Sequence, residues 1–306
     1  VLEMGMYALG EIEMLCRLAR PQVGVVTNVG PVHLERLGTV ERIAQAKAEL
    51  LAALPAGGVA VLNGDDPLVM AMSCPAGVRR LTYGRGEGNA VRATHVSSRG
   101  LEGVRFTVGV EAVPELGIAA GQCALSAPTP GAHTVMPALA AVAVGLLEGL
   151  TWDEIAAGLG NQAADLRLVP RRAQGGATLL DDTYNASPAS MLAALDLLGE
   201  IPGRHVAVLG DMLELGTHEE EGHRQVGARA AQVLDLLVTV GPRAARLADE
   251  ARRRGLPPEA VHSVMEVEEA VRLLPELVRE GDVLLVKGSR SVGLEGLVAA
   301  IAERAE

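Results

Sequence analysis

The second half of the chain shows the clearest alternation of apolar and polar positions. Short apolar runs of strand length alternate there with longer segments in which apolar residues recur at helical spacing. The strands predicted from this pattern are 177–181, 205–209, 234–240, 261–264 and 282–286, and the helices are 188–199, 219–231, 243–254, 266–279 and 292–304. Strands that alternate with helices of this length predict a Rossmann-like α/β domain, with helices on both faces of a parallel sheet.

The first half begins with a similar but less regular pattern. Val1 and Leu2 are interpreted as the end of a strand whose start is missing. Residues 11–20 have helical spacing, and Thr39 is expected to cap a longer helix that ends near Leu54. Buried strands are predicted at 23–27 and 59–62.

The pattern changes in the middle of the chain. Between about Arg79 and Thr129, short apolar runs are separated by glycine-rich turns, so we expect an antiparallel excursion. Its strands are predicted at 91–96, 104–110 and 122–125, and two helices follow at 134–148 and 152–159. Periodicity is weak after the second helix, and we place a domain boundary at Pro170, between domains 1–169 and 170–306.

Composition and charge exclude several classes of protein. The net charge of −11 argues against a general nucleic-acid binder, which needs cationic side chains against phosphates. The longest apolar stretch, 137–147, is too short to span a bilayer, so we expect no membrane insertion. Three widely separated cysteines without metal-type spacing are typical of a reduced cytoplasmic protein.

Lysine is almost absent from the chain. Of the 27 lysine and arginine residues, only Lys47 and Lys287 are lysines. Arginine supplies the positive charge everywhere else. A lysine that persists in such a sequence indicates a position at which arginine cannot do the same chemistry.

Polar side chains follow several of the predicted strands in the second half. The segments 181–185, 209–214 and 287–290 supply carboxylates, an amide, a hydroxyl and two cations. Because the carboxyl ends of parallel strands share one edge, these groups are expected to converge where such sheets bind ligands. Strand ends are also polar simply because they are solvated, and this interpretation stays open for each segment alone.

Glu3, His33 and Lys47 form a weaker candidate set in the first half. A carboxylate and an imidazole can both ligate a divalent cation, whereas a lysine ammonium has no lone pair to offer. A lysine that has reacted with CO₂ carries a carboxylate instead, and arginine cannot be modified in this way. An ordinary solvated lysine is the alternative explanation for Lys47.

Six short segments, in chain order, resemble the Mur ligase family and, within it, the MurF type. They are 3–5, 27–35, 44–50, 181–188, 209–216 and 286–290. The resemblance implies part of a central ATPase domain followed by a Rossmann-like C-terminal domain. It also implies an ATP-dependent carboxylate–amine ligase of peptidoglycan synthesis, acting as a monomer on UDP-N-acetylmuramoyl-tripeptide and D-alanyl-D-alanine. ATP would phosphorylate the tripeptide carboxylate, and the dipeptide amine would attack the acyl phosphate.

The same resemblance assigns roles to individual residues. The catalytic residues would be Lys47, His33 and Lys287. The ligands of Mg²⁺ would be Glu3, His33 and a carbamylated Lys47. The residues in contact with ATP would be Arg172, Asp182 and His133. The residues that face the dipeptide and the acyl phosphate would be Tyr184, Asn185, Ser289 and Arg290.

The chain departs from the family pattern at three points. The family has an N-terminal domain and a phosphate-binding loop before the position of Glu3, and without them this chain alone is expected to be inactive. Thr134 and Pro137 stand where the family has asparagines, which weakens the expected adenine contact. Arg171 replaces a glycine at the expected hinge. The alternative function is a non-catalytic binding or scaffold module derived from such a ligase.

Overall fold

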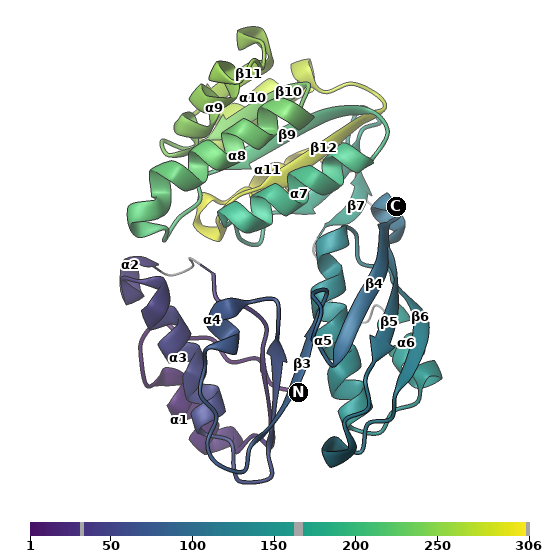
Figure 1. Cartoon of the computed structure of the whole chain (residues 1–306). Helices are drawn as coiled ribbons and strands as arrows, with labels where there is room; N and C mark the ends of the chain where they lie inside the picture. Colours follow the sequence, from purple (N-terminus) through teal and green to yellow (C-terminus); the bar gives the residue numbers. More distant parts are fainter. Residues whose placement is uncertain (31–33, 162–167, 304–306) are drawn as a thin grey trace. The chain divides into compact units, whose positions relative to one another are not determined.

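The computed structural model describes residues 1–30, 34–161 and 168–303 (Figure 1). The chain divides into two compact units, Val1–Ala163 and Ala164–Glu306, each with its own sheet and apolar core. This division falls a few residues before the predicted boundary. No helix within the described ranges is long and apolar enough to cross a bilayer.

The first unit is built on a six-stranded sheet whose strands follow the order of the sequence, from β1 to β6. Its strands are β1 (Val23–Val26), β2 (Val59–Asn63), β3 (Arg79–Gly84), β4 (Val91–Ser98), β5 (Val104–Val110) and β6 (Gly121–Ala127). Its helices are α1 (Glu11–Ala19), α2 (Leu34–Leu37), α3 (Val40–Ala52), α4 (Pro67–Met70), α5 (Val135–Leu147) and α6 (Trp152–Gly160).

The antiparallel part of this sheet begins later than the sequence pattern predicts. Strand β3 pairs in parallel with β2 on one side and with the start of β4 on the other. The connection from β2 to β3 contains α4 and is long enough to return the chain to the same end of the sheet, as a parallel pair requires. Within the described sheet, only β4–β5 and β5–β6 are antiparallel.

The start of the chain also differs from the prediction. Val1 and Leu2 lie in no strand and are exposed. A strand needs a partner to satisfy its backbone groups, and no described strand pairs with these residues. The short helix α2, which the sequence pattern did not predict, lies just before Thr39. Thr39 itself caps α3 as predicted, because its hydroxyl oxygen accepts a hydrogen bond from the Arg42 N–H at 3.3 Å.

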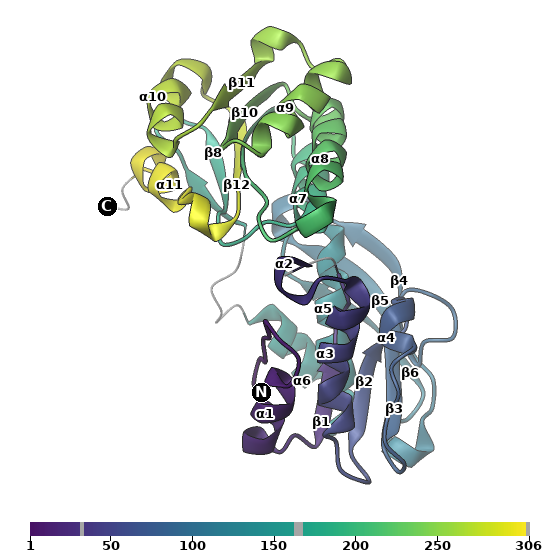
Figure 2. The ribbon, with the colours of Figure 1, turned by 90° about the vertical axis from the view of Figure 1, so that its left-hand side faces the viewer.

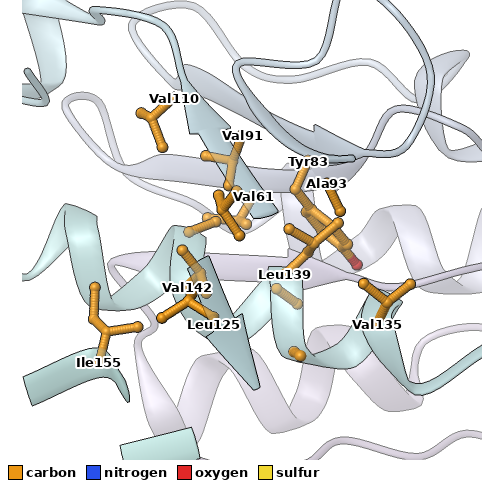
Figure 3. Packing of buried hydrophobic residues seen from close by; sticks show 14 of the residues in the cluster. Val61, Tyr83, Val91, Ala93, Val110, Leu125, Val135, Leu139, Val142 and Ile155 are labelled. Carbon is orange, nitrogen blue, oxygen red and sulfur yellow. The ribbon is translucent and has the colours of Figure 1, made fainter. Parts of the chain in front are cut away.

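Mainly aliphatic side chains fill the space between this sheet and α5, in a chain of which only 2% of the residues are aromatic. Val61 and Tyr83 come from neighbouring strands, Leu139 and Val142 from α5, and Ile155 from α6 (Figure 3). A second cluster, which includes residues of α3 and α4, covers the other face. Every residue of β2 is therefore buried, which explains its continuous apolar run in the sequence.

The second unit is a six-stranded sheet in the order β11-β10-β9-β12-β8-β7. Its strands are β7 (Val169–Arg172), β8 (Thr178–Asp182), β9 (Arg204–Gly210), β10 (Leu236–Val240), β11 (Val261–Val264) and β12 (Asp282–Lys287). Its helices are α7 (Pro188–Glu200), α8 (Glu219–Val233), α9 (Ala244–Arg253), α10 (Val267–Leu277) and α11 (Glu295–Ile301). Figure 2 shows α10 and α11 on one face of the sheet and α7, α8 and α9 on the other, as predicted.

The five strands β8 to β12 are parallel, and only β7 among the described strands of this sheet runs antiparallel to its neighbour. The sequence pattern does not reveal β7, in which Pro170 lies opposite Leu180 of β8. Proline is accepted in an edge strand because its missing N–H can face away from the neighbour. Arg171 and Arg172 are exposed, so this edge strand lacks the apolar run of the central ones.

Candidate functional site

In the first unit, Lys47 reaches from α3 to the segment that follows β1. Its Nζ donates a hydrogen bond to the Asn28 carbonyl oxygen at 2.6 Å. The side chain is half-buried, and burial lowers the pKa of its amine, an effect that the nearby Asp66 carboxylate opposes. A lowered pKa increases the fraction of neutral amine, which is the form that can react with CO₂.

Asp66 and Asn63, at the end of β2, organise the segment that Lys47 contacts. Asp66 Oδ2 accepts a hydrogen bond from the Val29 N–H at 2.7 Å, and its Oδ1 caps the first turn of α4. Asn63 Nδ2 donates to the Thr27 carbonyl oxygen at 2.8 Å. Neither residue is among those predicted from the sequence for this site, although an aspartate followed by proline is a recognisable helix start.

The other members of the predicted metal set are less well placed. Glu3 is exposed within residues 1–6, which form no helix or strand. His33 lies outside the described residues. In the parts of the chain that the structure describes, no three His, Cys, Asp or Glu side chains are grouped so as to hold a metal ion. Of the three predicted metal ligands, only Lys47 has defined hydrogen-bonding surroundings in the described part of the chain.

His133 is exposed and lies in a short 3₁₀ turn, Ala132–Thr134, that leads into α5. Thr134 is buried, and its hydroxyl donates a hydrogen bond to the Gly131 carbonyl oxygen at 2.7 Å. Thr134 therefore closes its own turn. Pro137 lies in the first turn of α5, where its missing N–H removes no helical hydrogen bond.

In the second unit, Lys287 and Asp182 form a buried ion pair at the ends of β12 and β8. The register of these adjacent strands places the two residues directly opposite each other. Lys287 Nζ lies 2.6 Å from Asp182 Oδ2, and the side chains are 2% and 7% exposed. Nζ also donates to the Asn185 carbonyl oxygen at 2.8 Å, so the ammonium ties the segment after β8 to β12. A compact ammonium suits this closed space better than a forked guanidinium.

Asp211 and Ser289 join the ends of β9 and β12. The Ser289 N–H donates to the Asp211 carbonyl oxygen at 3.0 Å, and the Ser289 hydroxyl oxygen accepts from the Leu213 N–H at 2.9 Å. The Asp211 carboxylate accepts from the Ala244 N–H at 2.7 Å and lies 3.6 Å from Arg243. Asp211 therefore has a structural role, because its carboxylate fills the positive N-terminus of α9.

Gly241 gives a direct test of this arrangement. Its φ is +104°, and an added Cβ would lie 2.6 Å from the Asp211 carboxylate. Gly255 has a φ of +103° with nothing within 4 Å, so Gly255→Ala is a matched control for backbone strain alone. We expect Gly241→Ala to reduce the free energy of unfolding by about 1–3 kcal/mol more than the control does. Urea unfolding measures both losses, and equal losses would show that the contact with Asp211 costs nothing.

Tyr184 and Arg290 form an exposed part of the same sheet edge. The Arg290 guanidinium carbon lies 5.5 Å from the centroid of the Tyr184 ring, within cation–π range, and Tyr184 is 55% exposed. Asn185 is exposed as well, and so is Arg172 on β7. The residues predicted to bind ligands in this unit thus include both buried supports and exposed groups.

His223, a fully buried residue of α8, is not among the site residues predicted from the sequence. Its Nε2 accepts a hydrogen bond from the Met212 N–H at 3.1 Å, within the segment that follows β9. The one available signal is its spacing from Val226 and Ala230, which places an ionisable side chain on the buried face of the helix.

Sequence comparison finds domain matches over most of the chain. Residues 1–145 match the Mur ligase middle domain, and residues 166–290 match the Mur ligase glutamate ligase domain. The UDP-N-acetylmuramoyl-tripeptide–D-alanyl-D-alanine ligase of Bacillus subtilis is 37% identical over 309 residues, and that of Escherichia coli is 34% identical over 311 residues. Both alignments cover 99% of this chain but 64% and 65% of the relatives, so the chain spans about two thirds of their length.

Solved structures of MurF ligases also match nearly the whole chain, over part of their own length. A MurF crystal structure from Acinetobacter baumannii has a TM-score of 0.84 and 29% identity, and the match covers 98% of this chain and 63% of that one. The MurF ligase of Thermotoga maritima in complex with ADP has a TM-score of 0.80 and 27% identity, with coverages of 98% and 66%. These structures confirm the fold class predicted from the sequence.

Proposed function

The chain belongs to the Mur ligase family, and on that premise we propose that it forms the ATP-binding and C-terminal parts of a MurF-type ligase. The enzyme would join D-alanyl-D-alanine to a UDP-N-acetylmuramoyl tripeptide. The observation that carries this proposal is the match, over 99% of the chain, to relatives named for that reaction.

The proposed reaction is amide formation through an acyl phosphate. ATP would transfer its terminal phosphoryl group to the tripeptide carboxylate, and the amine of the dipeptide would then displace phosphate. Both steps bring anionic oxygens together, so the protein must position the reactants and offer positive charge where negative charge develops.

Lys47 is proposed to act as a carbamate. Its half-buried amine with a lowered pKa is suited to reaction with CO₂, which would place a carboxylate beside the Asn28 segment. Together with Glu3 and His33, this carboxylate would offer oxygen and imidazole ligands that a divalent cation accepts. When bound, Mg²⁺ would supply positive charge to the phosphate and carboxylate oxygens.

Contacts with the nucleotide are proposed for Arg172, Asp182 and His133. The ADP complex of the Thermotoga relative supports nucleotide binding in this family. Lys287 donates a hydrogen bond to Oδ2 of Asp182, so a ribose hydroxyl would donate its hydrogen bond to Oδ1 of the same carboxylate. The dipeptide and the acyl phosphate are proposed to contact Tyr184, Asn185, Ser289 and Arg290.

We further propose that the protein works as a monomer in the cytoplasm, where its cysteines, free among the described residues, would stay reduced.

A non-catalytic binding module is the second candidate, and the turn before α5 favours it. The buried Thr134 hydroxyl is bonded within its own turn, and Pro137 carries no polar side-chain group. Neither residue can replace the amide that an asparagine would present to adenine. A module of this kind would bind ATP weakly or not at all.

A phosphate-release assay on the protein expressed from its complete reading frame distinguishes the two candidates. For the ligase we expect release that requires ATP, the UDP-tripeptide and D-alanyl-D-alanine together. Release that does not depend on the dipeptide would contradict the ligase proposal. Calorimetric titration with ATP provides the second measurement, because tight, saturable binding is expected of the enzyme and weak or no binding of the non-catalytic module.

A further inference from the structure

The segment that follows β9, residues 211–215, is held by hydrogen bonds from two neighbouring strand ends. The Asp211 N–H donates to the Val240 carbonyl oxygen at 3.1 Å, and the Asp211 carbonyl oxygen accepts from the Ser289 N–H at 3.0 Å. The Leu213 N–H donates to the Ser289 hydroxyl oxygen at 2.9 Å. The backbone on both sides of residue 212 is therefore fixed.

The intervening amide, Met212 N–H, is bonded from a third direction by His223 of α8. Nε2 of the imidazole lies 3.1 Å from Met212 N, and Nδ1 lies 2.7 Å from the Glu219 carbonyl oxygen. The Met212 amide requires a lone pair on Nε2, and the Glu219 carbonyl requires a proton on Nδ1. These partners define a neutral ring with its proton on Nδ1, and the ring is fully buried.

We propose that His223 is a positioning residue for the ligand-binding edge of this unit, because its neutral ring holds the Met212 amide and thereby keeps the Leu213 amide where it orients the Ser289 hydroxyl. The proposal rests on the proposed function, in which Ser289 faces the dipeptide. The Leu213 N–H occupies one lone pair of the Ser289 hydroxyl, so it restricts the direction in which that hydroxyl donates its own proton.

The charged groups around His223 come from three elements. Glu219 lies one turn earlier on α8, Asp211 belongs to the segment itself, and Arg243 and Arg246 lie at the start of α9. Each arginine is 2.7 Å from the Glu219 carboxylate. Burial is the strongest influence and lowers the pKa of His223, although Glu219 and Asp211 act in the opposite direction. At pH values above 6.5, His223 is therefore neutral and its hydrogen bond to the segment is intact. The ring gains a proton, and the hydrogen bond is lost, as the pH falls through the lowered pKa.

Apolar packing of the segment is separate from this hydrogen bond. The Leu215 side chain lies against Gly222, where an added Cβ would come within 3.3 Å of it. His223→Leu replaces the imidazole with an apolar side chain of similar size and removes the acceptor for Met212. In His223→Gln, the glutamine can place its Oε1 near the position of the imidazole Nε2 and accept from Met212. In His223→Asn, the side chain is too short to reach that position.

Amide hydrogen exchange, measured residue by residue by NMR on this chain without substrate, tests the positioning role. In His223→Leu we expect Met212 and Leu213 to exchange at least about tenfold faster, and in His223→Gln within about threefold of the parent rate. If the leucine variant does not fold, His223→Asn is the second variant that lacks the acceptor. Ser289→Ala is expected to release Leu213 while Met212 stays protected.

Parent-like protection of both amides in the leucine and asparagine variants overturns the proposal. This measurement does not depend on whether the protein is a ligase, so its failure is distinct from failure of the proposed function. In the assay on the complete protein, we expect His223→Leu to raise KM for D-alanyl-D-alanine by about tenfold with a smaller change in kcat, and His223→Gln to restore it. Loss of protection with an unchanged KM overturns the link to the substrate.

Discussion

Replacing Lys287 with methionine is expected to reduce the free energy of unfolding by about 3–5 kcal/mol. Methionine keeps most of the apolar stem, but it leaves the Asp182 carboxylate, which is 7% exposed, without its ammonium partner. The Asn185 carbonyl oxygen loses a donor as well. Urea unfolding followed by circular dichroism measures the loss.

Two further variants separate the causes of this loss. Lys287→Met combined with Asp182→Leu removes both charges and is expected to recover most of the stability, because no buried charge is left unpaired. Arg204→Met is a control at the opposite end of β12, where Arg204 is 2.8 Å from Asp282. Arg204 is 28% exposed, and Asp282 also accepts from the Arg279 N–H, so a smaller loss is expected there. A loss below about 1 kcal/mol for Lys287→Met would contradict the buried-pair argument.

Replacing Lys47 with arginine is expected to reduce turnover of the complete enzyme by about a hundredfold to a thousandfold. Arginine keeps the positive charge and a donor for Asn28, but it stays protonated and cannot form a carbamate. The free energy of unfolding is expected to change by less than about 1 kcal/mol, because no buried carboxylate loses an ion-pair partner. The steady-state rate of phosphate release measures the effect.

The carbamate itself is observable with isotopically labelled CO₂. A ¹³C NMR signal of a lysine carbamate is expected in the parent protein and absent in Lys47→Arg. Arg42→Lys is the matched control, since it adds an exposed lysine to the same helix, and it is expected to leave turnover unchanged. Parent-like turnover in Lys47→Arg would argue against a carbamate.

Periodicity predicted β8 to β12 and the helices between them, because the central strands are buried on both faces and each helix buries one of its own sides against the sheet. It predicted neither β7 nor β3, and the parallel pairing of β3 also differs from the expected antiparallel excursion. Both depend on the strand with which a segment pairs, and an edge strand with Pro170 has no apolar run to mark it. The start of a helix is easier to predict from sequence, because a cap such as Thr39 bonds to a residue of the helix that it begins.

Some residues of the candidate site could likewise be predicted from the sequence, and others could not. Residue types at the strand ends predicted the segments that carry Asp182 and Lys287, but the sequence does not show that β12 lies beside β8 and places them in contact. His223 was missed because its role depends on Met212, a partner outside its own helix that the helical spacing does not reveal. The metal-binding roles of Glu3 and His33 stay predictions.

The position of β12 in the sheet has a consequence for biosynthesis. Strands β8 and β9 are neighbours in the sequence, yet β12 lies between them. The Lys287–Asp182 contact spans 105 positions of the chain, and contacts of such separation slow folding. Until residues 282–287 have left the ribosome, β8 and β9 each present an open edge that invites pairing with another chain. Insertion of β12 therefore pairs both of these open edges at once and leaves β11 and β7 as the edges of the described sheet.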